Sequence, residues 1–257
     1  MIPIKDDNPQ LAVPYVTYGL IALNVLAWLG LQGAGFGDSL NASVCSYGLI
    51  PADLFTESHL RSSDNAVCPP NGAGWSGVLS SMFMHGSWMH IIGNMWFLYI
   101  FGGNVEDAMG PTRFAVFYLL SGIFAATAQV VADTSSVIPM VGASGAIGGV
   151  MGAYIVLYPR VKVHLLVILF IIFTTFRVPA WAMLGYWVVV QVLGSIASIG
   201  ATGGGVAFWA HLGGFIAGAA LALVFKDDEL LCNHPFHGWK QSRSAKSLWD
   251  DPDNQQR

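Results

Sequence analysis

Charged residues are scarce in this sequence. Asp, Glu, Lys and Arg make up 10% of its 257 residues, whereas a soluble chain contains roughly 25%. Hydrophobic residues make up 54%, and the mean hydropathy is +0.56. So few charges cannot cover a water-soluble surface, and so many apolar residues exclude a disordered chain. The composition therefore predicts an integral membrane protein.

Basic residues are also few, and they do not outnumber acidic ones. The chain has 11 Lys and Arg against 15 Asp and Glu, which gives a net charge of -4. A nucleic-acid-binding surface needs clustered basic residues, so we expect no nucleic-acid partner. The first residues lack the basic segment and the small-residue cleavage site of a signal peptide, so we expect the N-terminus to be retained.

Long apolar runs are abundant, and they determine the predicted fold. A helix that spans a bilayer needs about 20 apolar residues. We therefore predict six spans, at residues 13–31, 84–101, 113–132, 145–158, 180–199 and 206–225. The predicted fold class is an all-α polytopic membrane protein whose six-helix bundle occupies residues 13–225. Segments 1–12 and 226–257 would lie on the cytoplasmic side, and 33–78 would form an extracytoplasmic loop.

The apolar run 163–176 is harder to place. As a helix it would be about 21 Å long, which is short of the ~30 Å hydrocarbon core. If it does not cross and the N-terminus is inside, all 11 basic residues except Arg61 lie inside, as the positive-inside rule requires. We therefore expect a dipping or interfacial segment beside the cytoplasmic face, with both termini inside.

The three cysteines divide between the two sides of the predicted membrane. Cys45 and Cys68 lie in the outside loop, whereas Cys232 lies in the tail. In an oxidising compartment a disulfide would join Cys45 to Cys68, although two unpaired thiols remain the alternative. His234 and His237 near Cys232 could bind metal, but a fourth ligand is missing, so we expect no metal site. The tail is expected to be a mobile extension.

Carboxylates are absent from the later spans. No Asp or Glu occurs between residues 134 and 225, which removes the usual parts of a proton relay and weakens a transporter or channel interpretation. The apolar runs contain other polar residues that would each need a partner in a membrane: His85, His90, Asn94, Ser144 and His211. A single membrane histidine more often bonds helix to helix than catalyses, so only the combination carries a functional interpretation.

These polar residues share one depth in the predicted topology. The second, fourth and sixth spans all run from outside to inside, and each polar residue lies near an outer end. His90 and Asn94 are four residues apart and hence on one helical face. Ser144 opens the fourth span between Gly142 and Gly145, where glycine leaves the hydroxyl uncovered. The free N–H groups of a helix N-terminus would point at a group bound there.

Glycines predict how the fourth and sixth spans approach each other. Gly214 and Gly218 follow His211 at the spacing of a small-residue helix interface, and glycines from Gly145 onward supply a matching face. Close packing would bring the His211 imidazole within hydrogen-bonding distance of the Ser144 hydroxyl, as a base and a serine nucleophile require. With no acid nearby, the pair would be a Ser–His dyad.

The remaining polar residues predict how a tetrahedral oxyanion would be held. The candidate donors are the backbone N–H of Ser144, the amide of Asn94 and the imidazole of His90, with His85 as a neighbouring donor. Such donors are worth more in a low-dielectric site than in water. The loop that carries Gly142 would bring irregular backbone to membrane depth beside a water-filled cavity.

Three motifs occur in order on alternate predicted spans: His85 with His90 and Asn94, the Gly-x-Ser-Gly of 142–145, and the Ala-His-x-x-Gly of 210–214. Together they resemble the rhomboid family of intramembrane serine proteases over about residues 14–225. The resemblance implies Ser144 as nucleophile, His211 as general base and acid, and His90, Asn94 and Gly142 as oxyanion-stabilising residues. The supporting residues are His85, Gly145, Gly214, Gly218 and Glu106, the last with Gly110 in a structural motif.

The sequence departs from the family pattern at two positions. The family commonly has a Trp-Arg pair in the first outside loop, whereas Trp75 is followed here by Ser76. The position four residues after the nucleophile often carries an aromatic ring in the family and is Gly148 here. Loop anchoring and the floor of the site are therefore expected to differ.

The resemblance implies a serine endopeptidase that cuts transmembrane segments of other membrane proteins near the outer face, without metal or organic cofactor. Its implied partners are the lipid bilayer and transmembrane substrates whose helices unwind easily and carry small residues at the cut. The implied location is the cell (inner) membrane, with the active site on the extracytoplasmic side. The alternative is an inactive rhomboid-like protein that binds membrane clients. The oligomeric state stays open.

Overall fold

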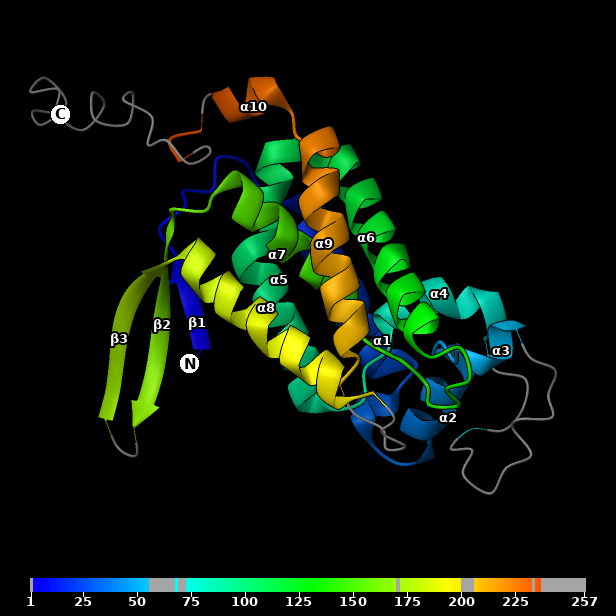
Figure 1. The fold of residues 1–257 in the computed structure, drawn as a ribbon. Helices are drawn as coiled ribbons and strands as arrows, with labels where there is room; N and C mark the ends of the chain where they lie inside the picture. Colours follow the sequence, from blue (N-terminus) through cyan, green and yellow to red (C-terminus); the bar gives the residue numbers. More distant parts are fainter. Residues whose placement is uncertain are drawn as a thin grey trace, which may run out of the picture.

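Six helices pack side by side, each where an apolar run predicted a span (Figure 1). The structure is a computed structural model, and it describes residues 2–55, 68, 73–169, 172–199, 206–232 and 234–236. The helices are α1 (Tyr15–Gly30), α5 (Trp88–Met109), α6 (Pro111–Ala132), α7 (Ser144–Leu157), α8 (Ala180–Ala197) and α9 (Phe208–Phe225). Their bounds differ from the expected ranges by a few residues, except that α5 continues well past residue 101.

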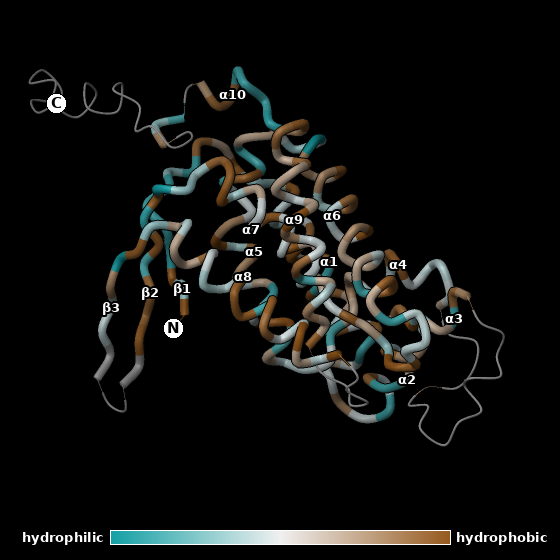
Figure 2. The backbone as a smooth tube through the Cα atoms, in the orientation of Figure 1, coloured by the Kyte–Doolittle hydropathy of each residue, from teal (hydrophilic) through white to brown (hydrophobic). Residues whose placement is uncertain are grey.

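The helices of this bundle are strongly apolar. Figure 2 shows hydrophobic and neutral residues along much of α6, α8 and α9, and hydrophilic residues in the segment beside α10. Among the described residues, three helices are long and apolar enough to cross a membrane: α6, α8 and α9. Both α1 and α7 are apolar but shorter. The chain is therefore mostly helical with three candidate spans, and six crossings remain a proposal.

A three-stranded antiparallel sheet lies beside the bundle, and it corrects the all-α prediction. We expected residues 163–176 to form a dipping or interfacial segment, and their described part belongs to β2 (Lys162–Leu169) and β3 (Ile172–Pro179), which pair with each other. β1 (Ile2–Asp6) pairs with the other edge of β2. Segments rich in Val, Ile, Thr and Phe favour strands, and the ladder pairs the backbone groups of an apolar run too short to span as a helix.

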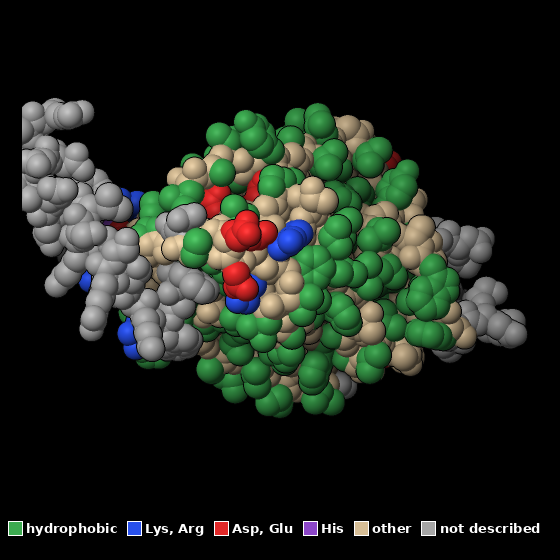
Figure 3. All heavy atoms as spheres, turned by 90° about the horizontal axis from the view of Figure 1, so that it is seen from above, with side chains coloured by type: hydrophobic (Ala, Val, Ile, Leu, Met, Phe, Trp, Pro, Cys, Tyr) green, Lys and Arg blue, Asp and Glu red, His purple; other side chains and the backbone are tan. Residues whose placement is uncertain are grey.

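The segment that leads into α1 and the segment that follows α9 lie at the same end of the bundle. β1 pairs with the strand that follows α7, and the N–H of Leu11 donates to the carboxylate of Asp107 near the end of α5. After α9, the N–H of Asp227 donates to the carbonyl of Ala108, and its carboxylate forms an ion pair with Arg113. Figure 3 shows this end of the molecule, where acidic and basic side chains gather among hydrophobic ones.

The start of the tail is packed against the bundle, so a mobile extension does not begin directly after α9 as expected. The short helix α10 (Asp228–Cys232) follows α9, and His234 is 3% exposed with its ring 4.7 Å from that of Tyr158. Residues 237–257 of the predicted tail, including His237, lie outside the described residues. Within the described part of the chain, no three metal-ligating side chains form a cluster.

Glu106 joins the start of α1 to the end of α5. Its carboxylate accepts hydrogen bonds from the N–H groups of Val16 and Thr17 and from the Thr17 hydroxyl. The first N–H groups of a helix have no acceptor within it, so this carboxylate caps α1. Gly110, with a φ of +74°, then ends α5. α5 continues beyond residue 101 because its polar residues Asn104 and Glu106 are buried there and form hydrogen bonds within the bundle.

The centre of the core is α7, the helix that begins at Ser144. Most of its side chains are buried, and it packs against α5, α6 and α9. Asp6 of β1 accepts hydrogen bonds from the hydroxyl of Tyr154 on α7 and from Nδ2 of Asn104 on α5. Burial raises the pKa of Asp6 to about 6. These contacts fix α7 from its far end and so help to fix the position of Ser144.

Short helices fill the loop region at the other end of the bundle: η1 (Gly33–Gly35), α2 (Asp38–Tyr47), α3 (Ala52–Phe55), η3 (Gly74–Ser76), α4 (Gly77–Ser80) and η4 (Ser81–Phe83). In this region a disulfide joins Cys45 to Cys68, whose Cα atoms lie 5.3 Å apart. Leu49 exchanges two backbone hydrogen bonds with Met140. The loop is therefore attached to the segment just before Ser144, although no Arg follows Trp75.

Candidate active site

Ser144 and His211 meet at the end of the bundle away from α10. Ser144 is the first residue of α7, and His211 lies in the first turn of α9. The Nε2 atom of His211 lies 2.8 Å from Oγ of Ser144, which is hydrogen-bonding distance for a base and a nucleophile. The structure thus brings together the two residues that the sequence motifs singled out.

Glycines allow this meeting because α7 and α9 touch along their backbones. A Cβ atom on Gly214 would lie 2.0 Å from the carbonyl oxygen of Gly145, and one on Gly218 would lie 2.1 Å from that of Gly149. No side chain fits at such distances, so a larger residue at either position would push the helices apart. The predicted small-residue interface therefore describes how the two helices pack here.

His90 and Asn94 on α5 face the space beside Ser144. The N–H of Gly86 donates to Nδ1 of His90 at 3.3 Å, so the proton of the neutral ring is on Nε2. The Nδ2 atom of Asn94 is buried and has no hydrogen-bond partner among the described residues. Because buried donors are normally paired, these two N–H groups suit an oxygen atom of a bound molecule, above all one that becomes negatively charged.

Gly142 leaves the space in which these donors converge. Its φ is +125°, and a Cβ atom there would lie 2.6 Å from Nε2 of His90 and 3.5 Å from Nδ2 of Asn94. Its own N–H donates to the carbonyl of Ser81 at 2.9 Å. Gly142 therefore has no free N–H for an oxyanion, which corrects its predicted role, and it contributes shape instead. The N–H of Ser144, at the start of α7, has no acceptor within that helix.

His85 lies behind His90, on the side away from solvent. It is 0% exposed, and its ring packs edge-on against the His90 ring with centroids 5.1 Å apart. Its backbone N–H and carbonyl exchange hydrogen bonds with the side-chain amide of Gln32 at 2.8 and 2.7 Å. These contacts hold His85 in place, and through it they support the ring of His90.

Two residues of α8 complete the surroundings of His211, and the sequence motifs included neither. The Oε1 atom of Gln191 lies 2.8 Å from Nδ1 of His211, and the ring of Trp187 lies 5.8 Å from the imidazole. An amide in an otherwise apolar span is a signal that could have identified Gln191, since it needs a partner there. Trp187 places an aromatic ring against His211 from α8.

A cavity of about 520 Å³ opens beside this pair. Polar and apolar residues line it, among them His90, Asn94, Ser144, His211, Phe97, Ile147, Met151 and Trp187. A concave, mostly apolar site with a few converging polar groups is typical of a ligand or substrate site. The cavity is therefore the candidate active site, with room for a short peptide segment.

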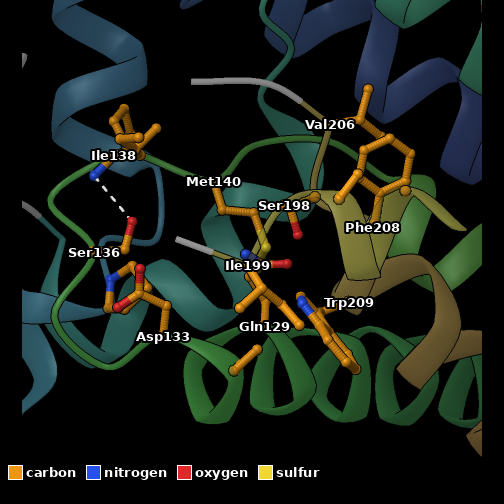
Figure 4. Close-up of a pocket in the computed structure, with 16 residues that line it drawn as sticks. Gln129, Asp133, Ser136, Ile138, Met140, Ser198, Ile199, Val206, Phe208 and Trp209 are labelled. Carbon is orange, nitrogen blue, oxygen red and sulfur yellow. Dashed lines mark hydrogen bonds between the residues drawn. The ribbon is translucent and has the colours of Figure 1, made fainter. Parts of the chain in front are cut away.

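A larger cavity, of about 760 Å³, adjoins the first but does not contain the dyad (Figure 4). The two cavities share the lining residues Pro139, Met140, Val206 and Ala207. Figure 4 shows Gln129 among the residues around it, and its Oε1 atom accepts a hydrogen bond from the N–H of Ala210. This contact ties the start of α9 to α6 and so helps to fix His211.

Known proteins from yeast, a plant and a bacterium are similar to more than half of this chain. Rhomboid protein 1, mitochondrial, of Saccharomyces cerevisiae is 30% identical over 145 residues, which are 55% of this chain and 39% of that protein. RHOMBOID-like protein 6, mitochondrial, of Arabidopsis thaliana is 26% identical over 168 residues, which are 65% of this chain and 47% of that protein. Rhomboid protease GluP of Bacillus subtilis is 28% identical over 218 residues, which are 82% of this chain and 35% of that protein.

These matches cover less than half of the length of each of the three relatives. The domain that they share is nevertheless clear, because the profile of the Rhomboid domain matches residues 72–227. That range contains the Ser144–His211 contact and both oxyanion candidates on α5. The chain belongs to the rhomboid family.

Proposed function

We propose that this protein is an intramembrane serine endopeptidase that uses a Ser144–His211 dyad. The observation that supports it most is the 2.8 Å contact between Nε2 and Oγ at the wall of a cavity. The orphaned Nδ2 of Asn94 in the same cavity adds a donor suited to an oxyanion. Membership of a family that includes a protein named as a protease supports the same activity.

The first half of the reaction forms an acyl-enzyme. Nε2 of His211 takes the Oγ proton of Ser144 while Oγ attacks the carbonyl carbon of the scissile peptide bond. The carbonyl oxygen becomes negatively charged and accepts hydrogen bonds from His90, from Asn94 and from the backbone N–H of Ser144. The imidazolium then gives its proton to the leaving nitrogen, the C–N bond breaks, and the new amino terminus departs.

The second half of the reaction uses water. A water molecule attacks the acyl carbon and passes a proton to Nε2 of His211, and the same donors hold the second oxyanion. The imidazolium then returns a proton to Oγ, the bond between the carbon and Oγ breaks, and the carboxyl product leaves. These steps use water, side chains that line the cavity and the backbone N–H of Ser144.

The protein is a multi-pass membrane protein by its family and its apolar helices. We place all six helices across the cell (inner) membrane, with both termini inside and the active site on the extracytoplasmic side. Two features support this orientation. Arg113 and Lys226 lie at the end where the chain enters α1 and leaves α9, as the positive-inside rule favours. The disulfide lies at the opposite end, which suits an oxidising compartment.

The proposal is tested with purified protein in liposomes that contain a fluorescently labelled single-pass substrate. We expect cleavage inside or close to the transmembrane segment, and mass spectrometry of the fragments locates the cut. A fluorophosphonate should block the cleavage and add its mass to the tryptic peptide that contains Ser144. The second candidate, a protein that binds membrane clients without cutting them, is suggested by relatives named RHOMBOID-like. Substrate that stays bound and uncut, with no adduct on Ser144, would establish it instead.

Asn94→Ala should lower kcat by about 10²- to 10³-fold with little change in KM. Asn94 donates to charge that develops only in the transition state, and loss of one such donor costs about 3 to 4 kcal/mol of barrier. The rate of substrate cleavage in liposomes measures the effect. Asn24→Ala is the matched control, because Asn24 is a buried amide on α1 that donates to the carbonyl of Leu20. Equal kcat in both variants would refute the donor role.

A further inference from the structure

Gln191 is an unusual residue for its place in the fold. It is 5% exposed and the one amide side chain in α8, which is otherwise built from apolar, aromatic and small residues. Polar groups inside a membrane helix are costly unless they are paired. Gln191 makes two hydrogen bonds, one to its own helix and one to His211. We infer that Gln191 is the positioning residue of the dyad, which fixes both the tautomer and the orientation of the His211 ring.

The first hydrogen bond fixes which end of the amide faces His211. The Nε2 atom of Gln191 lies 3.3 Å from the backbone carbonyl of Trp187, one turn earlier in α8. A carbonyl oxygen can only accept, so the group that faces it must be the NH₂ end of the amide. The oxygen end, Oε1, is therefore the group that lies 2.8 Å from Nδ1 of His211.

The second hydrogen bond fixes the proton on the imidazole. Because Oε1 of Gln191 can only accept, Nδ1 of His211 must be the donor. In a neutral ring with its proton on Nδ1, Nε2 carries the free lone pair. Nε2 is the atom that lies 2.8 Å from Oγ of Ser144, so the ring is held in the form that can take the Oγ proton.

Trp187 limits the remaining freedom of the ring. Its side chain lies against the His211 imidazole with centroids 5.8 Å apart and planes inclined at 37°, and it also contacts Phe215. The imidazole is thus held at Nδ1 by Gln191 and on one face by Trp187, while its other nitrogen faces Ser144.

Gln191 orients the His211 ring with a neutral amide, so no charge is buried. In soluble serine proteases an aspartate orients the histidine and stabilises the imidazolium, but an ionised carboxylate at membrane depth is costly. Gln191 offers the same acceptor oxygen without that cost. The dyad predicted from the sequence is therefore supported by a third residue, and the absence of acids from the later spans is compatible with an oriented base.

The test compares Gln191→Met, Gln191→Glu and Ser195→Ala. Methionine keeps the length of the side chain but removes the acceptor, whereas glutamate keeps an oxygen that can accept from Nδ1. Ser195 is the matched control, because it lies one turn further along α8, is 1% exposed, and its hydroxyl has no partner among the described residues. Two rates are measured for each variant: kcat and KM for cleavage of the liposome substrate, and the second-order rate of Ser144 phosphonylation by a fluorophosphonate.

We expect Gln191→Met to lower kcat and the phosphonylation rate by about 10- to 100-fold, with KM and Tm unchanged, since a positioned base contributes about 10²- to 10⁴-fold. Gln191→Glu should regain at least tenfold over Gln191→Met, and Ser195→Ala should equal the wild type. Wild-type rates in Gln191→Met, or equal losses in the Met and Glu variants, would overturn the inference. The inference rests on the proposed function, but the phosphonylation rate reports on Ser144 activation even if no peptide is cut, so the two can fail separately.

Discussion

Ser144→Ala should abolish cleavage of a single-pass substrate, and His211→Ala should lower kcat by about 10⁴-fold or more. Without Oγ no acyl-enzyme can form, and without the imidazole the Oγ proton has no acceptor. His90 cannot replace the base, because its Nε2 carries a proton in the tautomer that Gly86 favours. A loss of 10⁴ corresponds to about 5.5 kcal/mol of barrier, and initial rates in liposomes with equal amounts of protein measure it.

The double variant distinguishes a dyad from two independent contributions. Nucleophile and base act as a unit, so Ser144→Ala/His211→Ala should be no slower than Ser144→Ala alone. Substrate binding, measured by co-purification in detergent, should be equal in all three variants because both changes leave the apolar lining residues, such as Phe97 and Met151, in place. Substantial cleavage by Ser144→Ala would disprove the assignment of the nucleophile, whatever the other variants do.

The residues of the dyad were accessible from sequence because short-range rules connect them to structure. A spacing of four places His90 and Asn94 on one face of a helix, and glycines that recur every four residues predict a close helix pair. The contact between α7 and α9 follows from those glycines, and with it the approach of His211 to Ser144. Each step uses a rule that holds within one helix or between two.

Gln191 and the sheet were missed for the opposite reason. The Gln191–His211 contact depends on how α8 is rotated about its axis, and the glycine spacing that links α7 to α9 has no counterpart in α8. The residue that orients a catalytic histidine is usually an acid, whereas Gln191 is a neutral amide. Likewise, β1 and β2 pair although they are far apart in the sequence. The distribution of basic residues predicts on which side of a membrane a segment lies, but it does not predict that the segment is a strand. Hydropathy and periodicity do not predict which residues far apart in the sequence contact each other.

Gly214→Leu should inactivate the protein through the packing of two helices, without touching a reacting atom. A Cβ atom at this position would lie 2.0 Å from the carbonyl oxygen of Gly145, so α9 must move away from α7. Gly214 is one turn after His211, and a shift of about 1 Å at the imidazole costs about 10²-fold in rate. With the Oγ to Nε2 hydrogen bond broken, we expect kcat to fall by at least about 10³-fold, and Tm to fall because overpacking costs up to about 3 kcal/mol.

Gly185→Leu is the control that separates this packing effect from the general cost of a glycine substitution. A Cβ atom on Gly185 of α8 would meet no neighbouring element within 4 Å, so a leucine there should leave both kcat and Tm near the wild-type values. Gly218→Leu, whose Cβ would lie 2.1 Å from the carbonyl oxygen of Gly149, should lower Tm as much as Gly214→Leu but reduce kcat less, because it is a full turn further from His211. If Gly214→Leu keeps wild-type kcat and Tm, the backbone contact between α7 and α9 does not hold the dyad together, and the distance from His211 to Ser144 must be fixed by other contacts, such as those of Gln191 and Gln129.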